Sequence, residues 1–276
     1  MQIKREEDIS NVEDTLNNKG INLDITTLKK DEWVLENPIS LKLLNKMRQG
    51  KIGLEKYYNW KIFAWIKSWY DQAFVVDELT KDALVREDVN SLDLIKPWFK
   101  WRDLWKWTSY TKELYVIYIP LNKISIDNYP AIKNHLNKYK DKLSKRATRQ
   151  AWFEMQQPQE KFTELFHRPK IIYPDCAKEM RASFDDKNSY WTMSMYFLPY
   201  DPLILWILNS RLFDWYSRMS FATFWDPWKW GRVIFKSLYM KNVPIPLFNS
   251  ENNPLKEDLI NLVTKILEIT KRSEER

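Results

Sequence analysis

Side chains that could together cut a phosphodiester bond stand close to one another in this sequence. Asp175 follows a proline, and Asp185, Asp186 and Lys187 come shortly after it. Two acids can hold a metal ion while a lysine assists the attacking water, so this order is compatible with a metal-dependent nuclease. Such short patterns also arise by chance, and residues 185–189 have the composition of a turn. We therefore interpret these residues as a turn and keep the nuclease as an alternative.

Signatures of other catalytic chemistries are missing from the sequence. A methyltransferase needs a glycine-rich turn for S-adenosylmethionine and an Asn/Asp-Pro-Pro-aromatic loop for adenine. In this sequence Asn37-Pro38 and Asn253-Pro254 are each followed by an aliphatic residue. We interpret both prolines as helix starts. His135 and His167 are too few for a metal site or a triad, and we expect surface roles for both. Cys176, the only cysteine, fits a small buried side chain. We expect no catalytic residue, metal or cofactor on this chain.

Basic residues outnumber acidic ones. The sequence has 44 Lys and Arg against 37 Asp and Glu, a net charge of +7, so its surface should attract polyanions. The excess is concentrated in one stretch, where Asp141 is the single acid among seven lysines and arginines: Lys133, Lys138, Lys140, Lys142, Lys145, Arg146 and Arg149. A solvated helix face explains such a run. Contact with nucleic-acid phosphates also explains it, and both interpretations stay open.

Hydrophobic periodicity predicts an α+β fold, a mixed sheet with packed helices, because helical and strand-type segments occur without a strict βαβ alternation. The predicted strands are residues 62–66 and 73–76, interpreted as a hairpin around 68–71, then 114–119, 170–173, 180–184 and 192–197. The predicted helices are one from Pro38 to a stop at Gly50, then 78–87, 91–99, 129–146 and 202–218, and a last one from Pro254. The apolar stripe of the last helix is Leu259, Leu262, Val263, Ile266 and Ile269.

The composition is that of a globular protein, with 44% hydrophobic and 29% charged residues. Residues 1–7 lack the apolar run of a secretory signal. The longest apolar stretch, residues 198–207, is shorter than the roughly 20 residues that span a bilayer. We therefore expect a soluble, cytoplasmic protein with no membrane partner.

Seven segments, in order, resemble the TaqI-like C-terminal specificity domain of adenine-specific DNA methyltransferases, a family that includes single-chain Type IIG restriction-modification enzymes. Residues 65–77 are similar to the family's Gly-Ile-x-Thr-Gly-x-Asn-x-Ala-Phe-Val-Ile-Asp segment, and residues 95–97 with 100–104 are similar to its Ile-Lys-Pro and Arg-Gly-Arg-Asp-Ile. The other segments are residues 128–136, 152–155, 169–174, 207–213 and 244–246. The resemblance spans residues 33–247 and rests on the segments occurring in the same order as in the family.

The resemblance implies a DNA target-recognition domain over residues 31–248, with a linker or the tail of a catalytic domain at 1–30 and a C-terminal helix at 249–276. Such a domain reads base edges of double-stranded DNA, while a methyltransferase catalytic domain or subunit binds S-adenosylmethionine and flips the adenine. We expect phosphate contacts from cations in or beside predicted loops: Lys67, Lys100, Arg102, Lys106, Arg149 and Arg232. A protein-interaction or structural domain built on the basic helix and the last helix is the alternative.

Tryptophan is unusually frequent and glycine unusually rare. The sequence has 15 Trp and 4 Gly, whereas an average usage of about 7% predicts roughly 19 glycines. Where the family's motifs have glycine, this chain has Trp65, Trp69 and Trp101, and Trp206 fits the same category. In a few bacterial lineages the UGA codon encodes glycine, so we hypothesise that some of these tryptophans are glycines read with the wrong codon table. A genuinely tryptophan-rich core is the other explanation.

Overall fold

The computed structural model describes residues 12–20, 37–59, 63–64, 66–108, 114–160, 163–191, 194–226, 229, 231–248 and 254–274. The chain forms two units, Met1–Ile52 and Gly53–Arg276. In the first unit, helix α2 spans Val12–Lys19 and helix α3 spans Pro38–Arg48. Asn37 caps α3, because its side chain accepts a hydrogen bond from the Ser40 amide at 2.9 Å. The predicted helix start at Pro38 is confirmed, and so is the stop at Gly50, which follows α3 with a φ of +65°.

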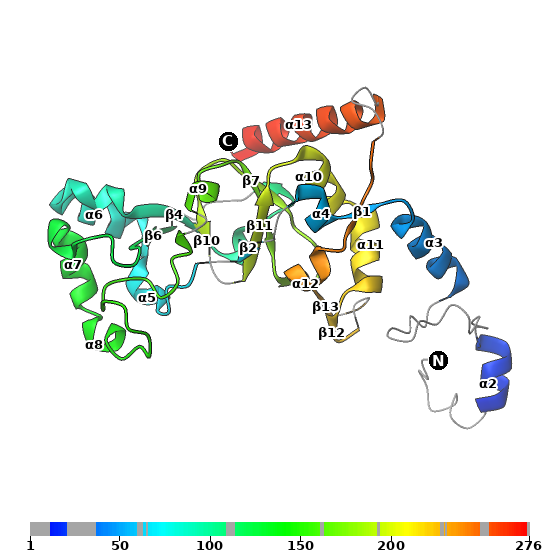
Figure 1. Cartoon of the computed structure of the whole chain (residues 1–276), viewed down its shortest axis with the longest axis horizontal. Helices are drawn as coiled ribbons and strands as arrows, with labels where there is room; N and C mark the ends of the chain where they lie inside the picture. The colour runs from blue at the N-terminus through cyan, green and yellow to red at the C-terminus, as the bar shows by residue number, and fades with distance from the viewer. Residues whose placement is uncertain are drawn as a thin grey trace. The chain divides into compact units, whose positions relative to one another are not determined.

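A four-stranded sheet with short helices around it makes up one part of the second unit (Figure 1). Strand β6 (Leu114–Ile117) pairs antiparallel with β3 (Val75–Asp77) and with β4 (Ile95–Phe99), and β10 (Tyr190–Trp191) pairs parallel with β4. The helices are α5 (Asp71–Phe74), α6 (Glu78–Glu87), α7 (Pro130–Asn137) and α8 (Lys140–Leu143). The predicted strand at 114–119 and helix at 78–87 are confirmed.

A five-stranded sheet makes up the other large part of this unit. Its central strand β7 (Lys170–Pro174) is buried along its whole length and pairs antiparallel with β11 (Met195–Pro199) and β9 (Ser183–Asp185). Strand β2 (Phe63–Ala64) pairs antiparallel with β11, and β5 (Trp107–Thr108) pairs parallel with β9. Helices α10 (Pro202–Asn209) and α11 (Arg211–Ser220) follow β11, and α13 (Pro254–Glu274) packs against α10 and β5.

Smaller elements complete the second unit. Strand β13 (Arg232–Ile234) pairs antiparallel with β12 (Thr223–Phe224) and β8 (Cys176–Ala177). The remaining elements are β1 (Ile52–Gly53), α4 (Leu54–Tyr58), η2 (Val89–Asp93), η3 (Trp101–Asp103), η4 (Ile126–Asn128), α9 (Thr163–Phe166), α12 (Ser237–Met240) and β14 (Pro244–Ile245). Helices and mixed sheets of this kind confirm the predicted α+β class.

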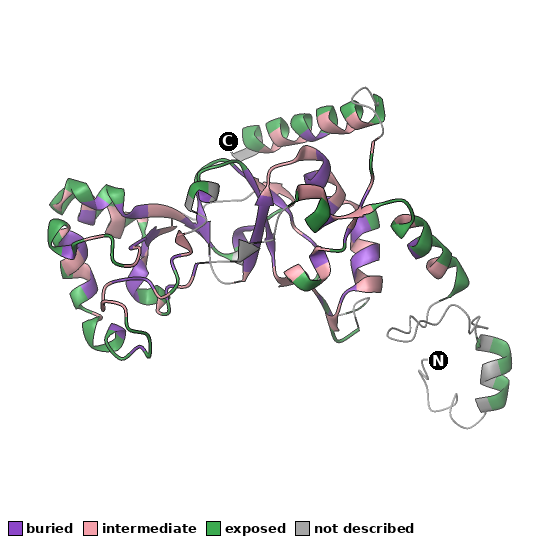
Figure 2. Ribbon diagram, in the orientation of Figure 1, coloured by how far each residue is buried: buried purple, intermediate pink, exposed green. Residues whose placement is uncertain are grey.

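The two larger sheets share one hydrophobic core. The Trp191 ring on β10 lies 5.1 Å from the Phe197 ring on β11 and 5.2 Å from the Phe166 ring on α9, between ring centroids. All three side chains are at most 1% exposed. Figure 2 shows buried residues along the strands and exposed residues on the outer sides of the helices. Because this core joins the sheets, the end of β4 and the start of β11 lie close enough to line one cavity, described below.

Two predictions for residues 62–99 are wrong. No hairpin forms, because β2 pairs with β11 and β3 pairs with β6, and residues 71–74 between them form the helical turn α5. The helical turn buries the consecutive residues Ala73 and Phe74 completely. The pattern of apolar residues that we read as a strand does not distinguish it from such a turn. The predicted helix at 91–99 is instead η2 followed by strand β4. Pro97 lacks the amide hydrogen that a helix needs there and its ring clashes with the preceding turn, so a helix through residue 99 is disfavoured.

Two predicted long helices are each divided in two. The range 129–146 contains α7 and α8, and its apolar residues Ile132, Leu136 and Leu143 are buried. Residues 202–218 fall in α10 and α11, and Ser210 between them accepts a hydrogen bond from the Phe213 amide at 3.1 Å. A serine that caps a helix start must leave the preceding helix, which explains this division.

The predicted last helix is confirmed as α13, but its predicted apolar stripe is only partly correct. Val263 is fully buried, whereas Leu262 and Ile269 are 51% and 66% exposed. The buried side of α13 is therefore rotated relative to the prediction and includes the half-buried Ile260 and Leu267.

Three tryptophans adopt a left-handed backbone conformation. The φ angle is +72° at Trp69, +79° at Trp107 and +62° at Trp225. This region costs an ordinary L-residue roughly 1–2 kcal/mol, whereas glycine adopts it readily. The geometry supports the glycine hypothesis at Trp69 and extends it to Trp107 and Trp225, which the family's motifs do not cover.

The other suspected positions gain no such support. Trp101 lies in η3 and Trp206 lies inside α10, where a helical backbone disfavours glycine. Trp65 lies outside the described residues. Each suspected tryptophan therefore has to be judged by its own backbone conformation.

We expect Trp225→Gly to stabilise the protein by about 1 kcal/mol, because relief of left-handed strain exceeds the entropy that glycine adds to the unfolded chain. Trp225 is 84% exposed, so the substitution loses little burial. The melting temperature should rise by roughly 2–4 °C in differential scanning calorimetry. Trp105→Gly is the control, since Trp105 is 56% exposed and has no left-handed backbone, and it should lower the melting temperature. A lower melting temperature for the Trp225 variant would contradict the strain argument.

Candidate nucleic-acid interface

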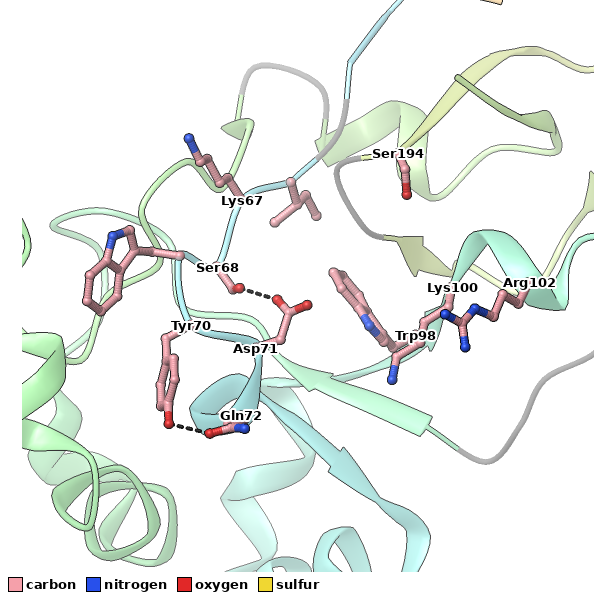
Figure 3. Close-up of a pocket in the computed structure, with 11 residues that line it drawn as sticks. Lys67, Ser68, Tyr70, Asp71, Gln72, Trp98, Lys100, Arg102 and Ser194 are labelled. Carbon is pink, nitrogen blue, oxygen red and sulfur yellow. Dashed lines mark hydrogen bonds between the residues drawn. The ribbon is translucent and has the colours of Figure 1, made fainter. Parts of the chain in front are cut away.

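A cavity of about 760 Å³ opens where the two larger sheets meet, and we call it the cationic pocket (Figure 3). Residues 66–72, which follow β2 and include the first turn of α5, line one side. Trp98 and Lys100 from the end of β4, Arg102 from η3 and Ser194 before β11 line the rest. The pocket therefore gathers side chains from three separate segments of the chain.

Local hydrogen bonds hold residues 66–72 in place. The Lys67 amide donates to the Gln157 carbonyl and the Gln157 amide donates to the Lys67 carbonyl, both at 3.0 Å. The Ser68 hydroxyl donates to the Asp71 carboxylate, and the Tyr70 hydroxyl donates to the Gln72 side chain (Figure 3). These contacts make the segment a defined wall of the pocket.

Asp103 positions the two cations that follow β4. It is only 3% exposed, its carboxylate accepts the Lys100 amide at 2.9 Å, and its own amide donates to the Lys100 carbonyl at 2.9 Å. The resulting tight turn presents Lys100 and Arg102 at the pocket. In the view of Figure 3, the buried Trp98 side chain lies between Asp71 and these two cations.

The pocket combines positive charge with polar groups. Lys67, Lys100 and Arg102 supply three cations, and the acid among the lining residues, Asp71, accepts the Ser68 hydroxyl. Lysine and arginine suit phosphate oxygens, while amide and hydroxyl groups such as those of Gln72 and Ser194 suit base edges. The arrangement is chemically suited to a nucleic-acid backbone with exposed base edges.

The structure brings together three of the six predicted phosphate-binding residues and leaves three elsewhere. Lys106 forms an ion pair with Glu179 at 3.2 Å. Arg149 is exposed in the loop beyond α8. Arg232 on β13 lines a separate cavity of about 140 Å³ with Arg181. A phosphate-binding role for these three stays a prediction.

Asp185, one of the acids considered for a nuclease, has a structural role. Asp185 is 2% exposed, accepts the Ser189 hydroxyl at 3.0 Å and the Lys187 amide at 3.1 Å, and lies 2.6 Å from the Lys170 amine. Burial raises the pKa of Asp175. Among the described residues, no group of three or more His, Cys, Asp or Glu is placed to hold a metal ion. The turn at 185–189 is confirmed, although the strands β9 and β10 that it joins belong to different sheets.

The buried pair of Lys170 and Asp185 should be essential for folding. We expect Lys170→Met to destabilise the protein by about 3–5 kcal/mol, because it leaves a buried carboxylate without its cation. Urea unfolding followed by circular dichroism measures the loss. Adding Asp185→Asn removes the uncompensated charge and should recover part of that stability. Equal stability of Lys170→Met and the parent protein would show that the pair contributes nothing.

His135 does not have the surface role that the sequence predicts. It is half-buried on α7, and its Nε2 lies 3.1 Å from the Ala73 carbonyl, so this nitrogen carries the proton. Burial lowers the pKa of His135, and nearby Lys138 lowers it further, against the raising effect of the Ala73 hydrogen bond. The folded protein therefore favours the neutral ring.

The stability of the fold should fall as pH drops below about 6.5, because His135 then takes up a proton more readily in the unfolded chain. Urea midpoints at pH 7.5 and pH 5.5 measure this loss. His135→Gln keeps a donor for the Ala73 carbonyl and should show a smaller drop. His167→Gln, at an exposed position, should keep the full drop. The same drop in the parent and the His135 variant would rule out this residue as the cause.

Comparison with known proteins finds a family match within the larger unit. Residues 109–245 match the family model of the TaqI-like C-terminal specificity domain. The five family-like segments from residue 128 onward fall within this range or at its end, and the two earlier ones precede it.

Individual relatives are restriction-modification proteins. The chain is 22% identical over 242 residues to the Type II methyltransferase M.PaeR7I of Pseudomonas aeruginosa, covering 85% of this chain and 40% of that protein. Its fold is similar to that of the Type IIL restriction-modification enzyme MmeI in complex with DNA, with a TM-score of 0.52 at 13% identity over 77% of this chain. The type IIG restriction endonuclease BpuSI gives a TM-score of 0.41 at 13% identity over 81% of this chain.

The chain is much shorter than these relatives. It spans 40% of the methyltransferase and 28% of each of the two solved chains. The similarity therefore concerns one region of larger proteins. No helix in the described ranges is both long enough and apolar enough to cross a membrane.

Sequence reasoning missed several residues of the cationic pocket. Tyr70 and Gln72 stand within the first family-like segment, so that motif could have pointed to them. Ser194 and Trp98 gave no signal, because only the meeting of the two sheets brings them to Lys67.

Proposed function

We propose that this chain is the DNA-recognition module of an adenine-N6 DNA methyltransferase or restriction-modification enzyme, and that its cationic pocket holds the backbone of the duplex. The observation that carries the proposal is the convergence of Lys67, Lys100 and Arg102 on one pocket in a specificity-domain fold. The kinship with a methyltransferase and the fold of a DNA-bound restriction-modification enzyme support it.

The proposed division of labour follows from the chemistry of the pocket. Lysine and arginine neutralise phosphates and set the register of the protein on the duplex, and Gln72 and Ser194 contribute polar groups of the kind that suit base edges to the same pocket. Methyl transfer is assigned to a catalytic domain or subunit that binds S-adenosylmethionine and flips the adenine. The recognition domain is proposed to span residues 31–248, between a linker at 1–30 and the C-terminal helix at 249–276.

Replacing both Lys100 and Arg102 by alanine should weaken binding to random-sequence duplex DNA by about tenfold or more, since each loses a charge-assisted phosphate contact. The slope of log Kobs against log salt should become shallower by about 1.8, because each phosphate contact contributes about 0.9. Fluorescence anisotropy between 50 and 200 mM salt, roughly the range where such slopes are measured, gives both values.

Lys265→Ala with Lys271→Ala is the matched control, since both lysines are exposed on α13 and contribute nothing to the pocket lining. An unchanged slope in the Lys100/Arg102 variant would remove these residues from the interface. Absence of duplex binding by the parent protein at low salt would favour the alternative, a protein-interaction domain. The exposed Leu262 and Ile269 on α13 are the surface that such a domain would use.

A further inference from the structure

The seven lysines and arginines between residues 133 and 149 fall into distinct classes in the structure. Lys133 is neutralised by Asp127 at 2.6 Å. Arg146 is 8% exposed and donates to four backbone carbonyls, those of Leu143, Ala151, Trp152 and Glu154, at 2.6–2.9 Å. Arg146 is therefore structural, whereas Lys133 is paired with an acid at the surface, and we leave both out of the phosphate interpretation of the basic run.

The remaining lysines form an exposed surface, which we call the lysine track and define as Lys138, Lys140, Lys142 and Lys145. All four are exposed. None forms an ion pair with a carboxylate in the ranges that the structure describes. Their mutual repulsion has little to offset it, because Asp141 is the single acid in this stretch. A polyanion would relieve that repulsion.

Tyr70 connects the lysine track to the cationic pocket. The Lys142 amine donates to the Tyr70 hydroxyl at 3.1 Å and lies 4.9 Å from the centre of its ring, and Tyr70 lines the pocket. The Tyr70 ring also meets the Tyr139 ring edge-on at 6.0 Å. On α7, His135 contacts the Ala73 carbonyl of α5, so helices α7 and α8 are held beside the pocket wall (Figure 1).

We propose that the lysine track binds backbone phosphates of the same duplex that enters the cationic pocket, and this inference rests on the proposed function. Duplex DNA carries one charge per roughly 1.7 Å of its axis, so phosphates continue past the pocket and meet the cations beside it. The Lys140 amine lies 5.2 Å from the centre of the Trp152 ring, a contact that restricts its side chain. Contacts to phosphates do not depend on which bases are present. They add affinity for every sequence equally.

The test replaces all four lysines of the track by glutamine and measures binding to random-sequence duplex DNA between about 50 and 200 mM salt. If each lysine contributes a phosphate contact, the affinity of the parent protein should fall about 100-fold more over this range than that of the variant. The corresponding Lys→Arg variant keeps the charge and should behave as the parent does. Because all four side chains are exposed and repel one another, the melting temperature of the glutamine variant should not fall.

The matched control replaces four cations of α13, Lys256, Lys265, Lys271 and Arg272, by glutamine. A salt dependence that is equal in the track variant and in this control would overturn the inference. If the Lys100/Arg102 variant flattens the salt dependence while the track variant does not, the inference fails and the proposed function stands. If the parent protein shows no salt-dependent binding, both fail.

Discussion

The buried ion pair between Lys170 and Asp185 joins the neighbouring strands β7 and β9 of the five-stranded sheet. Lys170 begins the central strand β7 and also donates to the Phe166 carbonyl at 2.7 Å, while its amine lies 5.7 Å from the centre of the Trp191 ring. Asp185 ends β9 and holds the turn toward β10 through Ser189. The pair therefore fixes the point where the chain leaves the five-stranded sheet and joins the four-stranded one. Neither charge could be buried there alone.

The position of the cationic pocket follows from that junction. Trp191 can pack against Phe166 and Phe197 because the turn delivers β10 to the edge of β4. The packing brings the end of β4, with Lys100, to the segment that carries Lys67. Positive charge at the pocket thus depends on a rigid apolar core behind it. This separation is typical of recognition domains, in which a scaffold positions the side chains of loops.

The tryptophans differ in how well a large side chain suits their backbone conformation and burial. Trp191 and Trp98 are buried core residues, as a tryptophan-rich core requires. Trp69, Trp107 and Trp225 instead occupy a backbone region that suits glycine, and Trp225 is almost fully exposed. A tryptophan-rich core therefore accounts for Trp98 and Trp191, whereas the glycine hypothesis stays a hypothesis for the positions with a positive φ. At Trp69 the question bears on function, because this side chain lines the cationic pocket.

Local patterns in the sequence were sufficient for part of this protein. The helix at Pro38, the strand at Leu114, the capped helix α6 and the turn at 185–189 follow from proline, capping residues and β-branched runs. The ordered motifs also indicated the specificity-domain family. Such features depend on neighbours along the chain, which a sequence displays directly.

Only the tertiary structure decided which segments pair and which cations act together. It replaced the expected hairpin by pairing with β6 and β11, buried Arg146, and brought Lys67, Lys100 and Arg102 to one pocket. It also turned α13 so that Leu262 faces outward. These outcomes depend on contacts between residues far apart in the chain. Their energies come from shared burial, which no local pattern records.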